Sequence, residues 1–455
     1  MPEYTPEAQR VVDDLLARIG EAAPQPRLEP TRRAVDLLGD PQRAYPIVHI
    51  TGTNGKTTTS RLIESILRAY GLRTGLLTSP HLVKLNERIM IDGEPISDER
   101  LVEQWDDIQP YLTIVDAELE ASGEAPLTFF EALTVLAFAA FADAPVDVAV
   151  IEVGMGGEWD STNVGDGQVA VLAPIALDHT HRLGNTIEEI ARTKSGIIKP
   201  LAEVVSAAQR PEALAEIVRA AELTESTLHV EGPGFALLDA SVAVGGQQIA
   251  VQGLAGSYDD LFLPLYGDHQ GHNAALAIAA VEAFLGRGTQ PLVPEVLADG
   301  LAQATSPGRL QVVAREPLVV VDAAHNPHGA RSLVQAVPKY FDLDEIAYVT
   351  GILADKDAHG VITELASLDE VAAELGRTTR IGAWFPTASH SERALTAAEV
   401  AELVVEIAGI EAEPLPLDAA LRAAREWATQ GLRRGVVVTG SITLIGEVID
   451  LAQQG

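Results

Sequence analysis

Apolar residues along this chain follow two patterns: short continuous runs, and stretches in which they recur every three or four positions. The first pattern is typical of buried strands and the second of amphipathic helices. Near the N-terminus, Val11, Leu15 and Ile19 stand four residues apart, and Pro24 and Pro26 then interrupt the spacing. The segment up to residue 45 is therefore predicted to be mainly helical.

Strands and helices alternate after this segment. Strands are predicted at Pro46–Ile50, Val146–Val153 and Val169–Ala176, and helices at Ser60–Tyr70, Phe130–Phe141, Ile187–Ser195 and Asn273–Leu285. The strands are apolar throughout, which indicates a mainly parallel sheet covered by helices on both faces. Residues 230–265 contain short Val- and Gly-rich segments with few helix formers, and they are predicted to form a small β insertion.

A second α/β series follows a predicted linker at Thr305–Arg309. Its strands are predicted at Leu318–Asp322, Ala347–Thr350 and Val436–Thr439. A chain of 455 residues has room for two or three domains. We predict an α/β protein with an N-terminal phosphate-loop ATPase domain over residues 1–305 and a smaller, Rossmann-like C-terminal domain over residues 306–455.

Composition and charge exclude several classes of protein. The chain has no cysteine, so disulfides, cysteine-bound zinc, iron–sulfur clusters and thiol nucleophiles are excluded. The 65 acidic residues outnumber the 32 basic ones, and a formal charge of −33 disfavours nucleic-acid or anionic-membrane partners. The N-terminus lacks a signal-like apolar core, and the run Ala132–Ala142 is shorter than the ~20 residues of a membrane span. A cytoplasmic monomer acting on small molecules is expected.

Candidate chemistry begins where the strand ending at Ile50 runs into a turn with Gly52 and Gly55, before Lys56 opens a helix. Glycines let the backbone N–H groups and the helix N-terminus approach phosphate oxygens, and the lysine reaches the β- and γ-phosphates. The strict phosphate-loop pattern has Gly where Ile50 stands, so an ordinary Gly-rich turn is the alternative. The residues predicted to bind ATP here are Gly52, Thr53, Asn54, Gly55, Lys56, Thr57 and Thr58.

The loop Thr51–Thr57 resembles that of the Mur ligase superfamily, which comprises peptidoglycan amino-acid ligases and the folylpolyglutamate synthase/dihydrofolate synthase group. Segments that resemble the folate branch are Thr78–Leu82, Asn86–Ile89, Leu127–Leu133, Glu152–Gly157 with Asp160–Asn163, Leu177–Thr180 with Lys194–Gly196, Asp322–Pro327 and Gly440–Gly446. They follow the family order over nearly the whole chain. The segment before the loop leaves little room for the N-terminal nucleotide-sugar domain of the peptidoglycan ligases.

The resemblance implies an ATP-dependent ligase that activates a carboxylate as an acyl phosphate. It would add L-glutamate to dihydropteroate, to the γ-carboxylate of reduced folylglutamates, or to both, and release ADP and phosphate. Two residues depart from the folate pattern: Thr57 and Ala323 stand where Gly is usual. Thr57 favours the alternative of a peptidoglycan-type ligase. A further alternative is an ATP-binding regulatory module, which would have no use for Glu152, His179 and Lys194.

The resemblance also implies the catalytic set Lys56, Glu152, His179 and Lys194. Ser79 and Glu152 would hold one Mg²⁺ and His179 a second, while Lys194 is implied to be carbamylated. Glu152 itself ends a predicted strand at the edge where α/β sheets bind ligands, although a strand-end carboxylate can also face solvent. For Lys194, the alternative is a lysine on a solvated helix face.

The remaining roles are implied in the same way. Asn273 and Arg309 would approach the nucleotide phosphates, Asp322 the ribose, and His325 and Ser441 the incoming glutamate. The residues implied around the pterin are Arg88, Thr128, Phe130 and Asp160. The alternatives for three of these residues are structural: His325 satisfied by backbone in a turn, Phe130 in the core, and Asp160 capping a turn.

Overall fold

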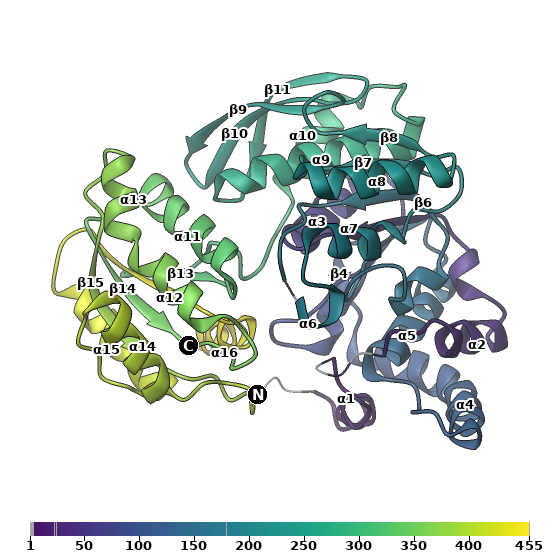
Figure 1. Ribbon diagram of the computed structural model, residues 1–455, viewed down its shortest axis with the longest axis horizontal. Coiled ribbons are helices and arrows are strands. Elements are labelled where there is room, and N and C mark those ends of the chain that lie inside the picture. Colours follow the sequence, from purple (N-terminus) through teal and green to yellow (C-terminus); the bar gives the residue numbers. More distant parts are fainter. Residues whose placement is uncertain (1–3, 22, 24, 179, 455) are drawn as a thin grey trace.

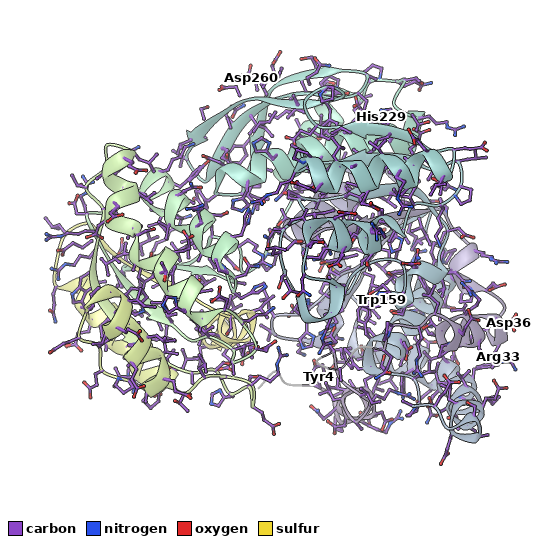
Figure 2. All side chains as sticks on the ribbon, in the orientation of Figure 1. Tyr4, Arg33, Asp36, Trp159, His229 and Asp260 are labelled. Atoms are coloured by element: carbon purple, nitrogen blue, oxygen red, sulfur yellow. The ribbon has the colours of Figure 1, made fainter. Side chains whose placement is uncertain are left out.

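The chain forms two lobes in a computed structural model that describes residues 4–454 apart from 22, 24 and 179. The larger lobe contains two sheets, and the smaller, C-terminal lobe contains one (Figure 1). Charged side chains project from the outer surface, as Arg33, Asp36 and Asp260 do (Figure 2). In the part of the chain that the structure describes, no helix is both long enough and apolar enough to cross a bilayer.

The central sheet of the larger lobe has eight strands in the order β4-β3-β2-β5-β1-β6-β7-β8. Their bounds are β1 Ile47–Thr51, β2 Thr74–Leu77, β3 Ile89–Ile91, β4 Glu94–Pro95, β5 Val148–Glu152, β6 Gly167–Leu172, β7 Glu203–Ser206 and β8 Thr227–Val230. The pairings that join β2, β5, β1, β6, β7 and β8 in this order are parallel, whereas the β2–β3 and β3–β4 pairings are antiparallel. The predicted mainly parallel sheet is therefore confirmed.

Helices cover both faces of this sheet because successive strand side chains point to opposite sides. Val48 and Ile50 pack toward α3 (Lys56–Ala69), α9 (Asp268–Gly286) and α10 (Pro294–Ala302). On the other face lie α1 Pro6–Leu16, α2 Glu29–Leu37, α4 Asp98–Ser122 and α5 Phe129–Asp143, followed along the sheet by α6 Thr180–Leu183, α7 Ile187–Ser195 and α8 Pro211–Leu223. Short 3-10 turns are η1 Pro41–Arg43, η2 Leu85–Arg88 and η3 Ser161–Val164.

The predicted β insertion is an antiparallel sheet packed on α9 (Figure 1). Its strands are β9 Ala236–Ala243, β10 Gly246–Gln252 and β11 Ser257–Leu263. The Glu282 carboxylate of α9 accepts hydrogen bonds from the N–H groups of residues 254–256 and from the Tyr258 hydroxyl. This buried carboxylate fixes the insertion to the helix whose N-terminal half faces the phosphate loop.

The smaller lobe is built on a five-stranded sheet in the order β12-β13-β16-β14-β15, with only β12 antiparallel. Its strands are β12 Gln311–Arg315, β13 Leu318–Asp322, β14 Glu345–Thr350, β15 Arg380–Pro386 and β16 Arg434–Thr439. One face packs against α11 Pro327–Tyr340, α12 Ala358–Ala366, α13 Leu368–Glu374 and α14 Ala397–Ala408, and the other against α15 Leu417–Thr429 and α16 Ile442–Gln454.

Several predicted boundaries differ from the structure. Helix α1 ends at Leu16, so Ile19 lies outside it, and β6 ends at Leu172 rather than Ala176 because Pro174 has no N–H to donate to a neighbouring strand. Patterning also did not identify α4, although its buried residues Leu101, Trp105 and Ile108 recur at the helical spacing.

Candidate active site

The phosphate loop, Glu152 and Ser79 meet at the carboxyl edge of the large sheet. Strands β1, β5 and β2 are adjacent and parallel, so the residues that follow them emerge side by side. The Thr57 hydroxyl donates a hydrogen bond to one Glu152 oxygen at 2.9 Å, and the Ser79 N–H approaches the other at 3.4 Å. The hydroxyl of Thr57, where the folate branch usually has Gly, thus holds the acidic side chain.

The loop itself has the backbone that anion binding needs. Gly52 and Gly55 have φ of 152° and 85°, a region that L side chains rarely adopt. A Cβ on Gly55 would also lie 2.6 Å from the Asn273 side-chain oxygen, so α9 closes against the loop there. Helix α3 starts at Lys56, whose ammonium donates to the Gly52 and Thr53 carbonyls at 3.1 and 3.3 Å.

Three other loop side chains connect the loop to its surroundings. The Thr53 hydroxyl donates to the Ala176 carbonyl and accepts its N–H. Asn54 bonds the ring of His328 in the smaller lobe at 3.0 Å, and the Thr58 hydroxyl bonds Ser306 in the connection between the lobes at 2.7 Å. The phosphate loop is therefore in contact with both lobes.

Glu152 is a buried carboxylate, 1% exposed, and does not face solvent. Burial raises its pKa, while the Lys56 charge and the hydrogen bonds from Thr57 and Ser79 act in the opposite direction. A divalent cation at this position would favour the ionised form further. The oxygens of Glu152, Ser79 and Thr57 are hard donors of the kind that Mg²⁺ prefers.

Lys194 is also buried, at 4% exposure, and not on a solvated helix face. It lies on α7, and its ammonium donates to the Gly52 carbonyl at 2.8 Å. Burial, and then the charge of Lys56, lower the pKa of Lys194 to about 7, with Asp178 and Asp160 opposing. A lysine with this pKa carries a substantial neutral, nucleophilic fraction near neutral pH.

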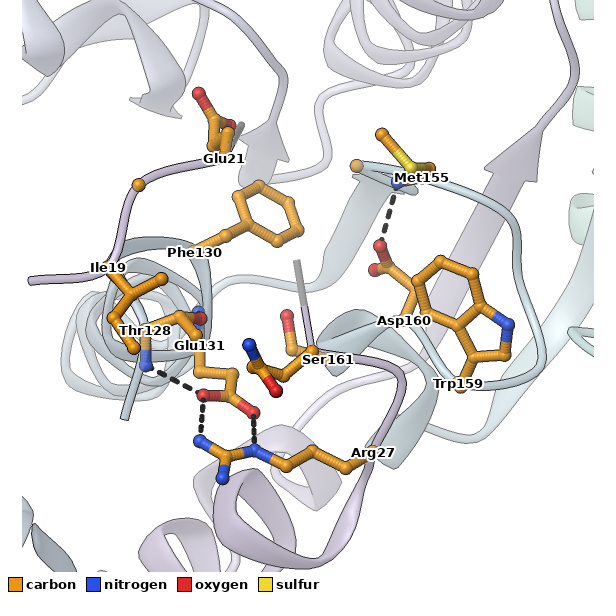
Figure 3. A pocket seen from close by; sticks show the side chains of 13 residues that line it. Ile19, Glu21, Arg27, Thr128, Phe130, Glu131, Met155, Trp159, Asp160 and Ser161 are labelled. Carbon is orange, nitrogen blue, oxygen red and sulfur yellow. Dashed lines mark hydrogen bonds and ion pairs between the residues drawn. The ribbon is translucent and has the colours of Figure 1, made fainter. Parts of the chain in front are cut away.

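A cavity beside this edge collects three of the residues implied around the acceptor. Thr128, Phe130 and Asp160 line it together, along with Trp159 and Glu21 (Figure 3). The partly exposed Phe130 ring lies between Glu21 and Asp160 in this view. Flat aromatic surface with a carboxylate at one end suits a flat heteroaromatic ring that carries N–H donors.

Two local motifs place these side chains. Thr128 and Glu131 form a capping box at the start of α5, and Arg27 pairs with both Glu131 oxygens at 3.0 Å, so Phe130 is fixed in the first turn (Figure 3). The Asp160 carboxylate accepts the N–H groups of Met155 and Thr162 and the Thr162 hydroxyl. Asp160 therefore both caps η3 and lines the cavity, and burial raises its pKa.

The smaller lobe contributes Asp322, His325 and Ser441 near the junction. Asp322 ends β13 and accepts the N–H groups of Leu310 and Ala324. Burial raises the pKa of Asp322, and the charge of Arg309 acts in the opposite direction. His325 bonds the Ala323 carbonyl at 2.9 Å, as expected of a turn histidine, and burial lowers its pKa to about 4. The Ser441 hydroxyl accepts the Leu444 N–H at the start of α16.

A second cavity lies between the lobes and is bounded by Asn54, Arg210, His328 and Lys356. The Lys356 ammonium stands 3.8 Å from the Asp178 carboxylate across it. His179, predicted to hold a second metal ion, lies outside the described residues. Among the residues that are described, no three His, Cys, Asp or Glu side chains gather as a metal site.

Sequence reasoning missed several residues of this region. Glu21, Arg27 and Trp159 line the cavity beside Phe130 and Asp160 but stand in no recognisable motif, and Met155 lies in the motif Glu152–Gly157 without having been assigned to the site. Arg61 follows Thr57 by one helical turn, and its buried Nε has no hydrogen-bond partner in the described part of the chain. The helical spacing from Thr57 was a signal for Arg61, whereas tertiary folding alone brings Glu21 to the cavity.

Two family models match the chain. The model for the Mur ligase middle domain matches residues 50–281, and that for the Mur ligase glutamate ligase domain matches residues 308–442. The first match ends within α9, and the second begins in residues 303–310, which connect α10 to β12.

Similar proteins are known from both sequence and structure. A protein of Mycobacterium tuberculosis called dihydrofolate synthase/folylpolyglutamate synthase is 45% identical over 356 residues, 75% of this chain and 73% of that protein. The structure of Mycobacterium tuberculosis folylpolyglutamate synthase complexed with ADP covers 98% of both chains, with a TM-score of 0.90 and 39% identity. Escherichia coli FolC in complex with DHPP and ADP matches with a TM-score of 0.81 and 30% identity, covering 100% of this chain and 99% of that chain.

Proposed function

The chain belongs to the folylpolyglutamate synthase/dihydrofolate synthase group of the Mur ligase superfamily, and from that membership we propose how its site forms an amide. It is an ATP-dependent ligase that adds L-glutamate to a pterin-bearing carboxylate. The proposed acceptors are dihydropteroate, the γ-carboxylate of reduced folylglutamates, or both. The observation that supports this most directly is the Thr57–Glu152–Ser79 cluster beside a cavity lined by Phe130 and Asp160.

The reaction proceeds in two steps. An acceptor carboxylate oxygen attacks the γ-phosphorus of ATP, the bond to the β-phosphate oxygen breaks, and ADP leaves. The glutamate amine then attacks the acyl carbon, and the tetrahedral intermediate expels phosphate to leave the amide, while the amine loses its proton. The loop N–H groups and Lys56 position the phosphates and offset the repulsion between the two anions.

Glu152 and Ser79, with Thr57 beside them, would hold Mg²⁺, which neutralises charge on the β- and γ-phosphates when bound. The fit rests on the buried Glu152 carboxylate, whose raised pKa marks a charge that a cation would stabilise. The second metal position predicted at His179 remains a prediction.

Carbamylation of Lys194 is proposed on the basis of its burial and its pKa of about 7. A neutral amine adds to carbon dioxide and releases a proton, which turns a cation into a carbamate anion. Incubation with ¹³C-bicarbonate, followed by carbon NMR, tests this directly. A carbamate resonance present in the native protein and absent from Lys194→Ala supports the modification, and equal spectra contradict it.

The acceptor's ring is proposed to lie against Phe130, with its N–H groups at Asp160 and Thr128 at the rim. Asn273 and Arg309 approach the nucleotide phosphates, supported by the Asn273 contact with Gly55 and by the effect of Arg309 on the Glu152 and Asp322 pKa values. Asp322 is assigned to the ribose, and His325 and Ser441 to the incoming glutamate. A monomer suffices for this scheme, because one chain supplies every residue in it.

The deciding experiment measures ADP release with glutamate and one of three acceptors: dihydropteroate, a reduced folylmonoglutamate, or a nucleotide-sugar peptide. Release that needs both glutamate and a pterin acceptor is expected. Turnover only with the nucleotide sugar would favour the peptidoglycan alternative. ATP binding without any acceptor-dependent release would favour a regulatory module.

A further inference from the structure

Arg88 is a buried cation whose charge is balanced by Glu21. Glu21 lines the cavity that also contains Phe130 and Asp160, which we call the acceptor cavity. The Arg88 side chain is 3% exposed, and its two terminal nitrogens pair with the two Glu21 oxygens at 2.8 and 3.0 Å. Its Nε–H donates to the His81 ring at 2.8 Å, and the guanidinium lies 5.0 Å over the Phe129 ring. In the described part of the chain, Glu21 is the carboxylate that forms an ion pair with Arg88.

This ion pair joins the acceptor cavity to the loop that carries Ser79. The Arg88 carbonyl accepts the Thr78 N–H at 2.9 Å, so Arg88 lies directly beside the chain that leads into Ser79. Glu21 lines the same cavity as Phe130 and Asp160 (Figure 3). Arg88 therefore connects, through Glu21, a residue that lines the cavity with the backbone that leads into Ser79.

Glu21 belongs to the connection between α1 and α2, which we call the acceptor strap and define by Ile19, Gly20, Glu21, Gln25 and Arg27. The strap is held on both sides of Glu21. The Ile19 carbonyl accepts the Phe129 N–H at 2.9 Å, and Arg27 donates to the Ala125 carbonyl at 2.9 Å. The Glu21 side chain is 39% exposed, so it reaches solvent while its partner does not.

We propose that Glu21 is an internal competitor for the acceptor's carboxylate. Its carboxylate occupies the Arg88 guanidinium in the free enzyme and gives way when an acceptor binds, so that Arg88 receives a carboxylate of the acceptor. This inference rests on the proposed function and adds a specificity-determining residue to it. An acceptor that carries no carboxylate cannot displace Glu21 from Arg88.

The exchange replaces one ion pair by another of the same kind. A buried guanidinium without an anion is strongly unfavourable, and a carboxylate satisfies its planar pair of N–H donors in a bidentate manner. Glu21 meets this requirement in the free protein, and the acceptor meets it in the complex. Because the Glu21 side chain is 39% exposed, it can turn toward water when it leaves Arg88.

In competition of this kind, the apparent affinity for the acceptor equals the intrinsic affinity multiplied by the fraction of time that Arg88 is free. If Glu21 occupies it about nine-tenths of the time, removal of the carboxylate tightens acceptor binding about tenfold. The alternative is that Glu21 merely positions Arg88, and its removal then weakens binding. The two roles therefore predict opposite changes in the dissociation constant of the acceptor.

The experiment compares the parent protein with the Glu21→Gln variant. Both are measured in the presence of ADP and in the absence of ATP. Binding of dihydropteroate is followed by quenching of Trp159, which lines the cavity. Glu21→Gln is expected to lower the dissociation constant roughly tenfold. For a reduced pterin that has no carboxylate, the same substitution is expected to leave the dissociation constant unchanged.

Two variants serve as controls. Glu29→Gln removes an equal charge at the start of α2, where Glu29 is 81% exposed and pairs with Arg32, and should leave dihydropteroate binding unchanged. Arg88→Lys cannot form the bidentate pair, so adding Glu21→Gln to it should no longer tighten binding. Thermal melting of each variant establishes that it is folded, and Glu21→Asp provides a second test because it keeps the charge.

Unchanged or weaker dihydropteroate binding by folded Glu21→Gln overturns the competitor role. Equal tightening of the pterin without a carboxylate also overturns it, because the effect would then not pass through Arg88. Failure of the proposed function looks different: neither the parent protein nor the variant would bind dihydropteroate or release ADP with glutamate.

Discussion

The nucleotide edge of the large sheet and the acceptor cavity beside it hold charge in different ways. At the edge, Glu152 and Lys194 are both buried, and their partners are a hydroxyl and backbone groups that cannot move far. Around the cavity, arginines pair with carboxylates, as Arg88 does with Glu21 and Arg27 with Glu131. Phosphoryl transfer demands fixed charges, whereas the exchange proposed at Arg88 needs a partner carboxylate that can be displaced.

The largest effect is expected at the fixed edge, from Glu152→Ala. Loss of the carboxylate removes the anchor proposed for the cation at the phosphates, and the rate of glutamate-dependent ADP release should fall about 100- to 1,000-fold. Steady-state kinetics with saturating ATP measure this. Glu94→Gln, an exposed change on the edge strand β4, is the matched control. A loss of rate below tenfold would show that Glu152 is not the anchor for the cation at the phosphates.

The pH dependence of the fixed edge follows from Lys194. With a pKa of about 7, its neutral fraction falls from about nine-tenths at pH 8 to about one-tenth at pH 6. Because the carbamate forms from the neutral amine, ADP release in bicarbonate buffer should fall roughly tenfold over that range. Lys194→Ala should be slow at both pH values and nearly insensitive to the change. A parent rate that is flat with pH would contradict the role of the neutral amine.

A smaller effect, confined to the acceptor, is expected from Phe130→Ala. Removal of the ring should raise KM for dihydropteroate about fivefold, because the loss of an aromatic contact amounts to roughly 1 kcal/mol. KM for ATP should remain within twofold of the parent value, measured in the same assay. Phe262→Ala on the β insertion controls for the loss of a ring elsewhere. Equal increases in both KM values would show that the two regions are not separable.

The smallest kinetic effect is expected from Arg27→Met, which acts only through the strap and α5. Glu131 would keep the Thr128 N–H but lose its bidentate partner, so KM for the acceptor should rise about threefold. The melting temperature should also fall, because Glu131 is 5% exposed and its charge would be left largely unpaired. Arg33→Met, which breaks an exposed pair with Glu118, is the control. An unchanged KM for the acceptor would show that the strap does not contribute to acceptor recognition.

The nucleotide edge was largely predictable from the sequence because its parts are local. A buried strand, two glycines, a lysine and a helix start stand next to one another, and parallel strands end at a common edge. The position of Glu152 at the end of β5 follows from the same rule. The sequence did not indicate that Thr57 would bond Glu152, since that contact depends on the registers of β1 and β5.

The acceptor cavity was only half predictable. Thr128, Phe130 and Asp160 were identified through their resemblance to a family pattern, and the structure brings them to one cavity. Glu21 and Arg27 come from the connection between α1 and α2, where nothing local distinguishes them from solvent-facing charges. Their partners Arg88 and Glu131 are 67 and 104 residues away along the chain.

By itself, the sequence predicted the glycine turn of the phosphate loop and a mainly parallel sheet, because steric freedom at glycine and apolar runs act over neighbouring residues. The tertiary structure decided which charges are buried and with what partner. Burial lowers the pKa of Lys194 and raises that of Glu152, and it depends on the packing of segments distant in the chain. The pairing of Arg88 with Glu21 rests on the same long-range packing, which no pattern of neighbouring residues encodes.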